Sequence, residues 1–272
     1  MKTVSCLSIT LALLALLLAQ DPAPTPVIVE TEATKELNEA ARAYREGNFA
    51  EAQAHSERAL QLEPQNRTAL IFVARTTHAQ YRPGIVTPEN AAKARQAIVA
   101  YHRVLERMPG DDEAYKAVAY LYGALKEEGL LRAWILQRAL DGSMSNEKRA
   151  EAFVVLASKD WDCSFQITDL PANKVTTIQE GKAYFSYKLP KDRADFDRAK
   201  QCAESGLEMV NTAITLTPES EAAWSYKTNI VLELAKQAEM LGRLRQKREL
   251  MRQYEEALNE TTRLAKRSQS NP

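Results

Sequence analysis

The chain has little of the residues that interrupt helices. Its 272 residues include only 9 glycines and 11 prolines. Glycine and proline are the least favourable residues inside a helix, and most of the prolines lie in a few clusters. The sequence therefore allows long uninterrupted helices. The length has room for one large domain or two ordinary ones.

The chain also lacks an excess of charge of either sign. Lysine and arginine total 36, which equals the total of aspartate and glutamate, so the formal net charge is zero. A strong nucleic-acid-binding protein normally carries a clear basic excess. No RNP-like, zinc-finger or basic-zipper pattern occurs in the sequence. We therefore expect no nucleic acid among the partners.

Sequence motifs for catalysis and for metal binding are missing as well. There is no phosphate-binding glycine loop, no HExxH, no G-x-S-x-G and no CxxC. The three histidines, His55, His78 and His102, do not pair at the i, i+4 spacing that places two ligands on one helix face. The stretch Trp-Asp-Cys at 161–163 has no histidine paired with it in sequence. We expect no enzyme, no catalytic residue, no metal site and no cofactor.

The longest apolar run lies at the N-terminus. Residues 7–19, LSITLALLALLLA, follow the charged Lys2 and precede a polar, proline-rich stretch at 21–32. A run of about 13 residues is typical of a signal peptide, whereas a membrane-spanning helix needs about 20. Counting from Val4 lengthens the run, so an uncleaved anchor is the alternative. Residues 1–20 are predicted to export the protein to the periplasm or the exterior, cleaved or membrane-anchored.

Only three cysteines are present. Cys6 precedes the apolar run, so it cannot be a lipoprotein cysteine, which must follow that run. Cys163 and Cys202 remain if the leader is removed. In an oxidising compartment such a pair can form a disulfide, and two buried free thiols are the alternative. A bridge would close a loop of about 40 residues and could stabilise the fold by up to ~4 kcal/mol.

Short stretches of the chain recur. When Pro64, Pro109 and Pro218 are aligned, small residues precede them and large residues follow them at matching positions: Ala52, Ala97 and Gly206 before, and Leu70, Tyr115 and Trp224 after. A small residue on a helix face lets a neighbouring helix approach closely, and proline cannot continue a helix. The pattern predicts a unit of helix, turn, helix and turn.

This pattern resembles the tetratricopeptide repeat. The unit at residues 33–66 matches best, and its signature positions hold Ala40, Gly47, Phe49, Ala52, Ala59 and Pro64. The resemblance implies an all-α superhelix (α-solenoid) of helix-turn-helix repeats over residues 33–265. The expected repeats are about 33–66, 67–110, 111–143, 147–218 and 219–265. Residues 266–272 are predicted to be a disordered tail.

The resemblance also implies a binding groove. In this family the first helices of the pairs line a concave face, and by register that face would hold Tyr44, Arg45, Ile71, Arg75, His78, Lys116, Tyr120, Val154, Ser158 and Trp161. This set mixes aromatic, cationic and apolar side chains, which suits a protein or peptide partner. Packing between repeats is the alternative role for several of them.

Residues 164–192 depart from the helical pattern. The stretches SFQIT and VTTIQEGKAYFSYKL are rich in β-branched and aromatic residues, and Glu180-Gly181 suits a hairpin turn. Cys163 and Cys202 bracket the segment. We expect a loop or short β-hairpin near the concave face, clasped at its base by a disulfide. A mobile surface loop without a role is the alternative.

Taken together, these patterns predict an exported repeat scaffold that binds another protein through a concave groove. Cell-envelope assembly would suit such a scaffold if the source is a Gram-negative bacterium. The alternative is an enzyme or small-ligand-binding protein that uses residues 161–192. The membrane would be involved only through a retained N-terminal segment.

Overall fold

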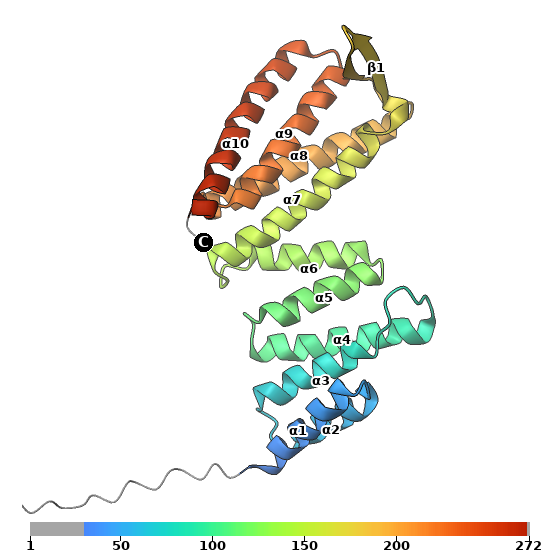
Figure 1. Cartoon of the computed structure of the whole chain (residues 1–272), viewed down its shortest axis with the longest axis vertical. Helices are drawn as coiled ribbons and strands as arrows, with labels where there is room; N and C mark the ends of the chain where they lie inside the picture. The colour runs from blue at the N-terminus through green and yellow to red at the C-terminus, as the bar shows by residue number, and fades with distance from the viewer. Residues whose placement is uncertain (1–29, 271–272) are drawn as a thin grey trace, which may run out of the picture.

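A computed structural model describes residues 30–270, which fold into five consecutive helical hairpins and one β-hairpin (Figure 1). The predicted fold class, an all-α superhelix of helix-turn-helix repeats with a small insertion, is confirmed. The predicted signal segment and most of the proline-rich linker lie outside the described residues. Among residues 30–270, no helix is long and apolar enough to cross a membrane.

The helical hairpins follow one another along the superhelix (Figure 1). They are α1 (Glu32–Arg45) with α2 (Phe49–Leu62), α3 (Arg67–Ala79) with α4 (Pro88–Arg107), α5 (Asp112–Ala124) with α6 (Glu128–Leu140), α7 (Asn146–Thr168) with α8 (Arg193–Leu216), and α9 (Glu221–Met240) with α10 (Leu244–Ser270). Each hairpin packs mainly on its neighbours in sequence, as in other repeat arrays.

Polar side chains determine where most of these helices begin. A side-chain oxygen accepts a hydrogen bond from a backbone N–H of the first turn at Thr31, Asn66, Thr87, Asp111, Ser145, Asp192 and Ser220. The first turn of a helix has N–H groups without a partner inside the helix, and these caps satisfy one of them each. The first helix of every hairpin is capped in this way.

The small residues that recur in the sequence allow the helices to pack closely. Ala52 and Ala97 are fully buried. A Cβ atom on Gly206 would lie 3.2 Å from both the Asp160 Cβ and the Ile230 Cδ1 atoms. The missing side chain at Gly206 therefore lets α8 approach α7 and α9 at the same point.

The apolar core runs from hairpin to hairpin. One cluster joins α3, α4 and α5 around Tyr101 and Leu121, and another joins α6 to α9 around Phe153 and Ile230. Tyr122 packs against both clusters. The core is thus continuous across the middle of the superhelix, so the two halves of the chain stabilise each other.

The insertion begins later than predicted. Residues 164–168 continue α7, so the prediction that they are not helical was wrong. Ser164 and Thr168 are buried against α9 and both donate hydrogen bonds to Glu233, and this packing outweighs their β-propensity. After a short 3₁₀ turn (η1, Pro171–Asn173), β1 (Lys174–Gln179) pairs antiparallel with β2 (Lys182–Tyr187).

The two ends of the repeat domain also differ from the prediction. Helix α1 already begins at Glu32, the last residue of the predicted linker. Helix α10 continues to Ser270, so residues 266–270 are helical and not disordered as predicted. Arg267 forms an ion pair with Glu219, which precedes α9. The last turns of α10 thus lie against the start of its partner helix.

Candidate functional site

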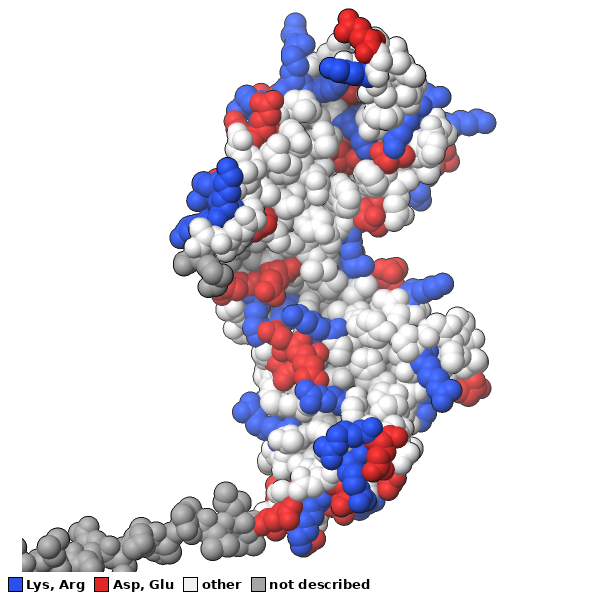
Figure 2. Space-filling view, in the orientation of Figure 1, with Lys and Arg blue, Asp and Glu red and all other residues white. Residues whose placement is uncertain are grey.

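Two hollows open along the first helices of the hairpins. The N-terminal hollow lies over α1, α3 and α5, with one side chain from α4, and has a volume of about 730 Å³. The C-terminal hollow lies between α7, α9, α10 and β2, and has a volume of about 450 Å³. Lysine and arginine side chains are interspersed with aspartate and glutamate over the visible face of the molecule (Figure 2).

The N-terminal hollow brings together half of the predicted groove residues. Its lining includes Tyr44, Arg75, His78, Lys116 and Tyr120. These side chains come from three helices that are separated in sequence by the second helix of each hairpin. The register of the repeat therefore places them along one surface.

Aromatic rings form one side of this hollow. The His78 ring lies 5.8 Å from the Tyr120 ring and 5.7 Å from the Tyr101 ring, centroid to centroid. The Nδ1 atom of His78 is 3.2 Å from the Tyr101 hydroxyl. Tyr44 and Tyr120 are exposed, whereas Tyr101 is buried and its pKa is raised to about 12 by that burial. The sequence analysis did not include Tyr101. This residue lies on the second helix of its hairpin, whereas only the first helices were expected to line the groove.

The charges of the N-terminal hollow are only partly balanced. The Arg75 guanidinium donates to both carboxylate oxygens of Glu113, and this hydrogen bonding holds the pKa of Glu113 below its usual value. Lys116 is exposed and has no carboxylate within ion-pair distance in the described part of the chain. Lys116 is thus available to pair with an acidic group of a ligand.

The other predicted groove residues have different surroundings. Val154 is buried in the core between hairpins, so the prediction that it lines the groove was wrong. Ile71 is half-buried against the core of α3, α4 and α5, and the Ser158 hydroxyl donates within its own helix to the Val155 carbonyl. Arg45 is exposed but lines neither hollow.

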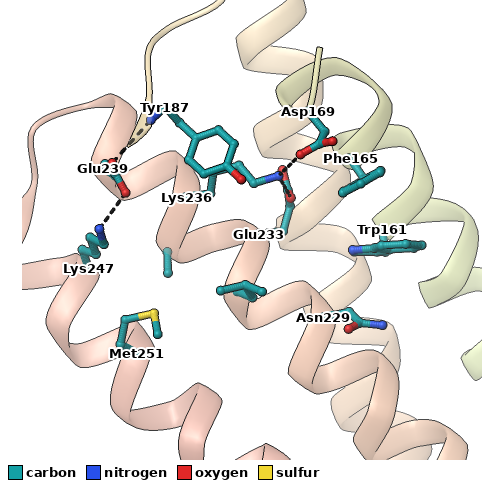
Figure 3. A pocket seen from close by; sticks show the side chains of 12 residues that line it. Trp161, Phe165, Asp169, Tyr187, Asn229, Glu233, Lys236, Glu239, Lys247 and Met251 are labelled. Carbon is teal, nitrogen blue, oxygen red and sulfur yellow. Dashed lines mark hydrogen bonds and ion pairs between the residues drawn. The ribbon is translucent and has the colours of Figure 1, made fainter. Parts of the chain in front are cut away.

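Trp161 is the predicted groove residue that lines the C-terminal hollow (Figure 3). Its ring stacks on that of Phe165, one turn further along α7, at a centroid distance of 5.1 Å. Leu232 and Met251 add apolar surface from α9 and α10. The hollow is therefore aromatic and apolar where α7 faces α9.

A buried ionic network forms the wall of this hollow near the β-hairpin. The Lys236 Nζ atom lies 2.7 Å from a Glu233 carboxylate oxygen and 3.5 Å from an Asp169 oxygen. It also lies 4.9 Å from the Phe165 ring centroid and 4.8 Å from that of Tyr187 (Figure 3). The ammonium group is thus enclosed by two carboxylates and two aromatic rings, and it joins α9 to α7 and to the hairpin.

The β-hairpin is held against α9 by the contact between Lys236 and the Tyr187 ring and by one hydrogen bond. The Tyr187 backbone N–H donates to a Glu239 carboxylate oxygen at 3.4 Å, and the other Glu239 oxygen pairs with Lys247 at 2.6 Å. The repeat pattern could not reveal this network, because Asp169 and Tyr187 lie far from α9 in sequence and no member belongs to the repeat signature.

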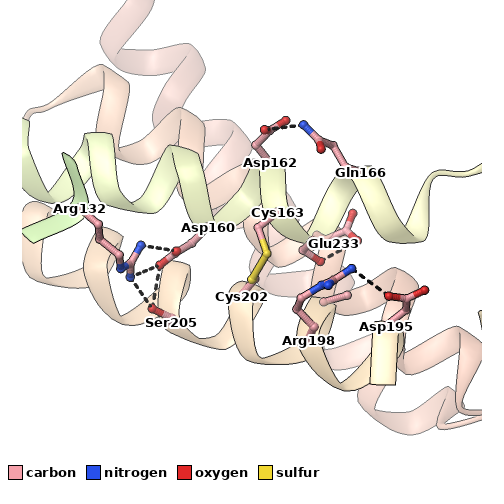
Figure 4. Close-up of a disulfide and its surroundings, with 12 residues drawn as sticks. Arg132, Asp160, Asp162, Cys163, Gln166, Asp195, Arg198, Cys202, Ser205 and Glu233 are labelled. Atoms are coloured by element: carbon pink, nitrogen blue, oxygen red, sulfur yellow. Dashed lines mark hydrogen bonds and ion pairs between the residues drawn. A yellow bond between two sulfur atoms is a disulfide. The ribbon is translucent and has the colours of Figure 1, made fainter. Parts of the chain in front are cut away.

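Cys163 of α7 and Cys202 of α8 form a disulfide in the structure (Figure 4). Their Cα atoms are 6.1 Å apart. Both cysteines lie inside helices and not at the base of the hairpin, so the bond joins α7 to α8. One turn earlier in α7, Asp160 is buried and accepts hydrogen bonds from Arg132 at 2.7 Å and from Ser205 at 2.7 Å. These contacts join α6, α7 and α8 beside the disulfide.

In residues 30–270, no group of three or more histidine, cysteine, aspartate or glutamate side chains converges to hold a metal ion. The charged groups that line the C-terminal hollow are engaged with one another in ion pairs.

Burial lowers the pKa of His78 below its ordinary value of 6.5. The unfolded chain therefore binds a proton at this site at a higher pH than the folded protein does, so folding stability falls as the pH drops below about 6.5. We expect the imidazole resonances of His78 to titrate in NMR with a midpoint below 6.5. His78→Gln would assign those resonances, and a midpoint at or above 6.5 would contradict the prediction.

Comparison with known proteins gives resemblances of fold only. No protein-family model matches the chain, and no curated protein matches it. Among solved structures, MamA from Desulfovibrio magneticus RS-1 is similar at 13% identity with a TM-score of 0.42, covering 89% of this chain and 99% of that one. Similarity at this level carries no argument about function.

Two further solved structures are similar. YrrB, described as a TPR protein with an unusual peptide-binding site, has 11% identity and a TM-score of 0.36, covering 84% of this chain and 91% of that one. The TPR2AB domain of yeast Sti1 in complex with pHSP90 has 16% identity and a TM-score of 0.32, covering 83% of this chain and 98% of that one. The fold assignment rests on the hairpins of this chain itself.

Proposed function

We propose that this protein is a non-catalytic scaffold that binds a segment of another protein along the N-terminal hollow. The observation that carries the proposal is the grouping of exposed Tyr44 and Tyr120 with the unpaired Lys116 on one surface. Aromatic side chains supply much of the binding energy in protein interfaces. An open, elongated surface over three helices suits an extended segment better than it suits a small molecule.

The charges of the hollow favour an acidic segment. Arg75 is already engaged with Glu113, so Lys116 is the cation that remains for a partner. A carboxylate that reaches Lys116 would lie beside the rings of Tyr120 and His78, where an apolar or aromatic side chain of the same segment could pack. We therefore infer a partner segment that combines a carboxylate with an apolar side chain.

We further infer that the scaffold works outside the cytoplasm. The apolar run at 7–19 supports export. The disulfide between Cys163 and Cys202 supports it too, since such bonds persist in oxidising compartments. Cell-envelope assembly is a setting that suits an exported scaffold of this kind.

Lys116→Glu combined with Tyr120→Ala is expected to weaken partner binding at least tenfold, because it reverses the available charge and removes an aromatic anchor. The wild-type protein would first be crosslinked to its partner in the native host, and the affinity for that purified partner would then be measured. The matched control is Lys266→Glu with Leu258→Ala, which makes the same kinds of change at exposed positions of α10.

Circular dichroism would verify that both double variants fold. A loss of affinity in the hollow variant alone would support the proposal. Equal affinities in the two variants would place the partner elsewhere and overturn it. Failure to recover any partner with the wild-type protein would also count against a scaffold.

A second candidate function is the binding of a small apolar ligand in the C-terminal hollow. The observation that favours it is the volume of about 450 Å³ lined by Trp161, Phe165 and Met251, since ligand pockets commonly enclose ~300–1,000 Å³ with mostly apolar walls. Trp161 would report such binding through its fluorescence, and Trp161→Phe would remove the signal from this site.

A further inference from the structure

The β-hairpin leaves most of its side chains in solvent. Each residue of β1 except Lys174 is exposed, and Ile178 and Phe185 retain 74% and 60% of their accessible surface. A two-stranded hairpin in water is only marginally stable, and a third strand or a helix against one face is normally required. Here only the Tyr187 end lies against α9.

One edge of this hairpin has unpaired backbone groups. The Lys188 N–H donates to the Asn173 carbonyl at 3.0 Å. Backbone groups alternate in direction along an antiparallel pair, so those of Val175 and Thr177 face β2 while those of Thr176 and Ile178 face outward. Within residues 30–270, the outward N–H and C=O groups of Thr176 and Ile178 have no hydrogen-bond partner. Such an edge is a template for pairing with another strand.

The other edge of the hairpin is partly covered. The same alternation directs the Tyr187 backbone away from β1, and its N–H is bonded to Glu239 of α9. The hairpin stands at one end of the molecule, beyond the body of the helical hairpins (Figure 1). An incoming strand would therefore meet the β1 edge without displacing a helix.

We propose that the outer edge of β1 pairs antiparallel with β1 of a second copy of this chain, forming a four-stranded sheet across a two-fold axis. In this arrangement Thr176 lies opposite Thr176 of the second copy, and Lys174 lies opposite Ile178 of the second copy. The outward N–H and C=O groups of Thr176 and the outward N–H of Ile178 then find partners, while the Lys174 N–H keeps its bond to the Pro171 carbonyl. The interface is isologous, as in most homodimers.

Among registers whose axis passes through an outward-facing residue, charge and turn geometry favour this one. A two-fold axis at Lys174 would place two ammonium groups opposite each other, which is unfavourable. An axis at Ile178 would bring Glu180 of the turn, which has a φ of 49°, into the ladder. The register centred on Thr176 avoids both problems and creates a threonine–threonine pair, a favourable cross-strand pairing.

The same register sets the side chains of the two copies side by side on both faces of the combined sheet. Val175 lies opposite Thr177 of the second copy, and Thr177 is already paired with Tyr184 within the hairpin. On the other face, Phe185 is paired with Thr176, next to the two-fold axis. The strand KVTTIQ is also rich in residues that favour sheets.

The proposal is tested by the mass of the full exported protein in solution, measured by sedimentation over a wide range of concentrations. The wild type is expected to dimerise as concentration rises. Thr176→Lys places two ammonium groups opposite each other at the axis and should weaken dimerisation roughly fivefold or more. The matched control, Thr177→Lys, adds the same charge at a neighbouring exposed position that faces Val175 of the second copy, and should dimerise nearly as well as the wild type.

A charge-swap mixture makes the test specific to the two-fold axis. Thr176→Glu alone should dimerise weakly, whereas an equimolar mixture of Thr176→Lys and Thr176→Glu should form a heterodimer, because opposite charges then face each other. A wild type that stays monomeric at high concentration would overturn the proposal. So would equal dimerisation of Thr176→Lys and Thr177→Lys. Binding of a partner at the N-terminal hollow is a separate measurement, so either proposal can fail alone.

Discussion

Replacing Cys163 and Cys202 together by serine is expected to lower the free energy of unfolding by roughly 3–4 kcal/mol. The bond connects residues 39 apart in sequence, and opening it frees the unfolded chain to adopt many more conformations. Both cysteines are only half-buried, so serine can occupy each site without leaving an unpaired polar group sealed in the core. The loss should therefore reflect the missing cross-link and not a cavity.

Urea denaturation gives the measurement and its control. The oxidised wild type should unfold at a higher urea concentration than the double variant, and reductant should bring the wild type close to the variant. Reductant should leave the variant itself unchanged. A wild type whose midpoint does not respond to reductant, together with titration of two free thiols at these positions, would contradict the prediction.

The second large effect is expected at Glu233, whose carboxylate is buried between α7 and α9. Its side chain is 2% exposed and accepts hydrogen bonds from Ser164 and Thr168, in addition to its pairing with Lys236. Glu233→Ala would leave the buried Lys236 ammonium with one carboxylate of the described residues, Asp169 at 3.5 Å, and the Thr168 hydroxyl at 3.3 Å. Removal of one partner of a buried ion pair typically costs ~3–5 kcal/mol, and we expect a loss of that size.

Two further variants distinguish this explanation from a general loss of charge. Glu256→Ala removes an exposed carboxylate that pairs with Arg252 on α10, and such surface pairs contribute little to stability. Glu233→Leu combined with Lys236→Met removes both buried charges and should recover much of the stability, because neither charge is left unpaired. A Glu233→Ala variant no less stable than Glu256→Ala would show that the network does not stabilise the fold.

The stability of this network bears on the β-hairpin as well. Lys236 contacts the Tyr187 ring, and Glu239 accepts from the Tyr187 N–H. The hairpin is thus fixed at one end by the same helix that carries Glu233. A hairpin held at its base presents β1 in a constant orientation, which the proposed pairing between two copies requires.

The repeat architecture could be predicted from the sequence because its determinants are local. Capping residues such as Asn66 and Ser220 begin helices through contacts with residues two or three positions away. Small residues such as Ala52 recur at a fixed offset from a terminating proline, so a repeated unit can be recognised without knowing its surroundings. The hairpin turn at Glu180 and Gly181 is local too, and both residues adopt the positive φ angles, 49° and 74°, that such a turn uses.

The candidate site was predictable only where it follows the repeat register. Tyr44, His78 and Tyr120 meet in the N-terminal hollow because each occupies the first helix of its hairpin. Val154 has the same register, yet it is buried in the core that α6 to α9 form. Periodicity assigns a face of a helix, but the neighbouring helices determine how much of that face remains open.

The sequence by itself determined the helical hairpins, their order and the position of the β-turn, because these depend on contacts within a few residues. Only the tertiary structure decided that residues 164–168 extend α7, that Lys236 is enclosed by groups from α7 and the hairpin, and that the C-terminal hollow exists. Those features depend on side chains about 70 residues apart, such as Ser164 and Glu233. Their energies arise from burial and pairing, which no local pattern encodes.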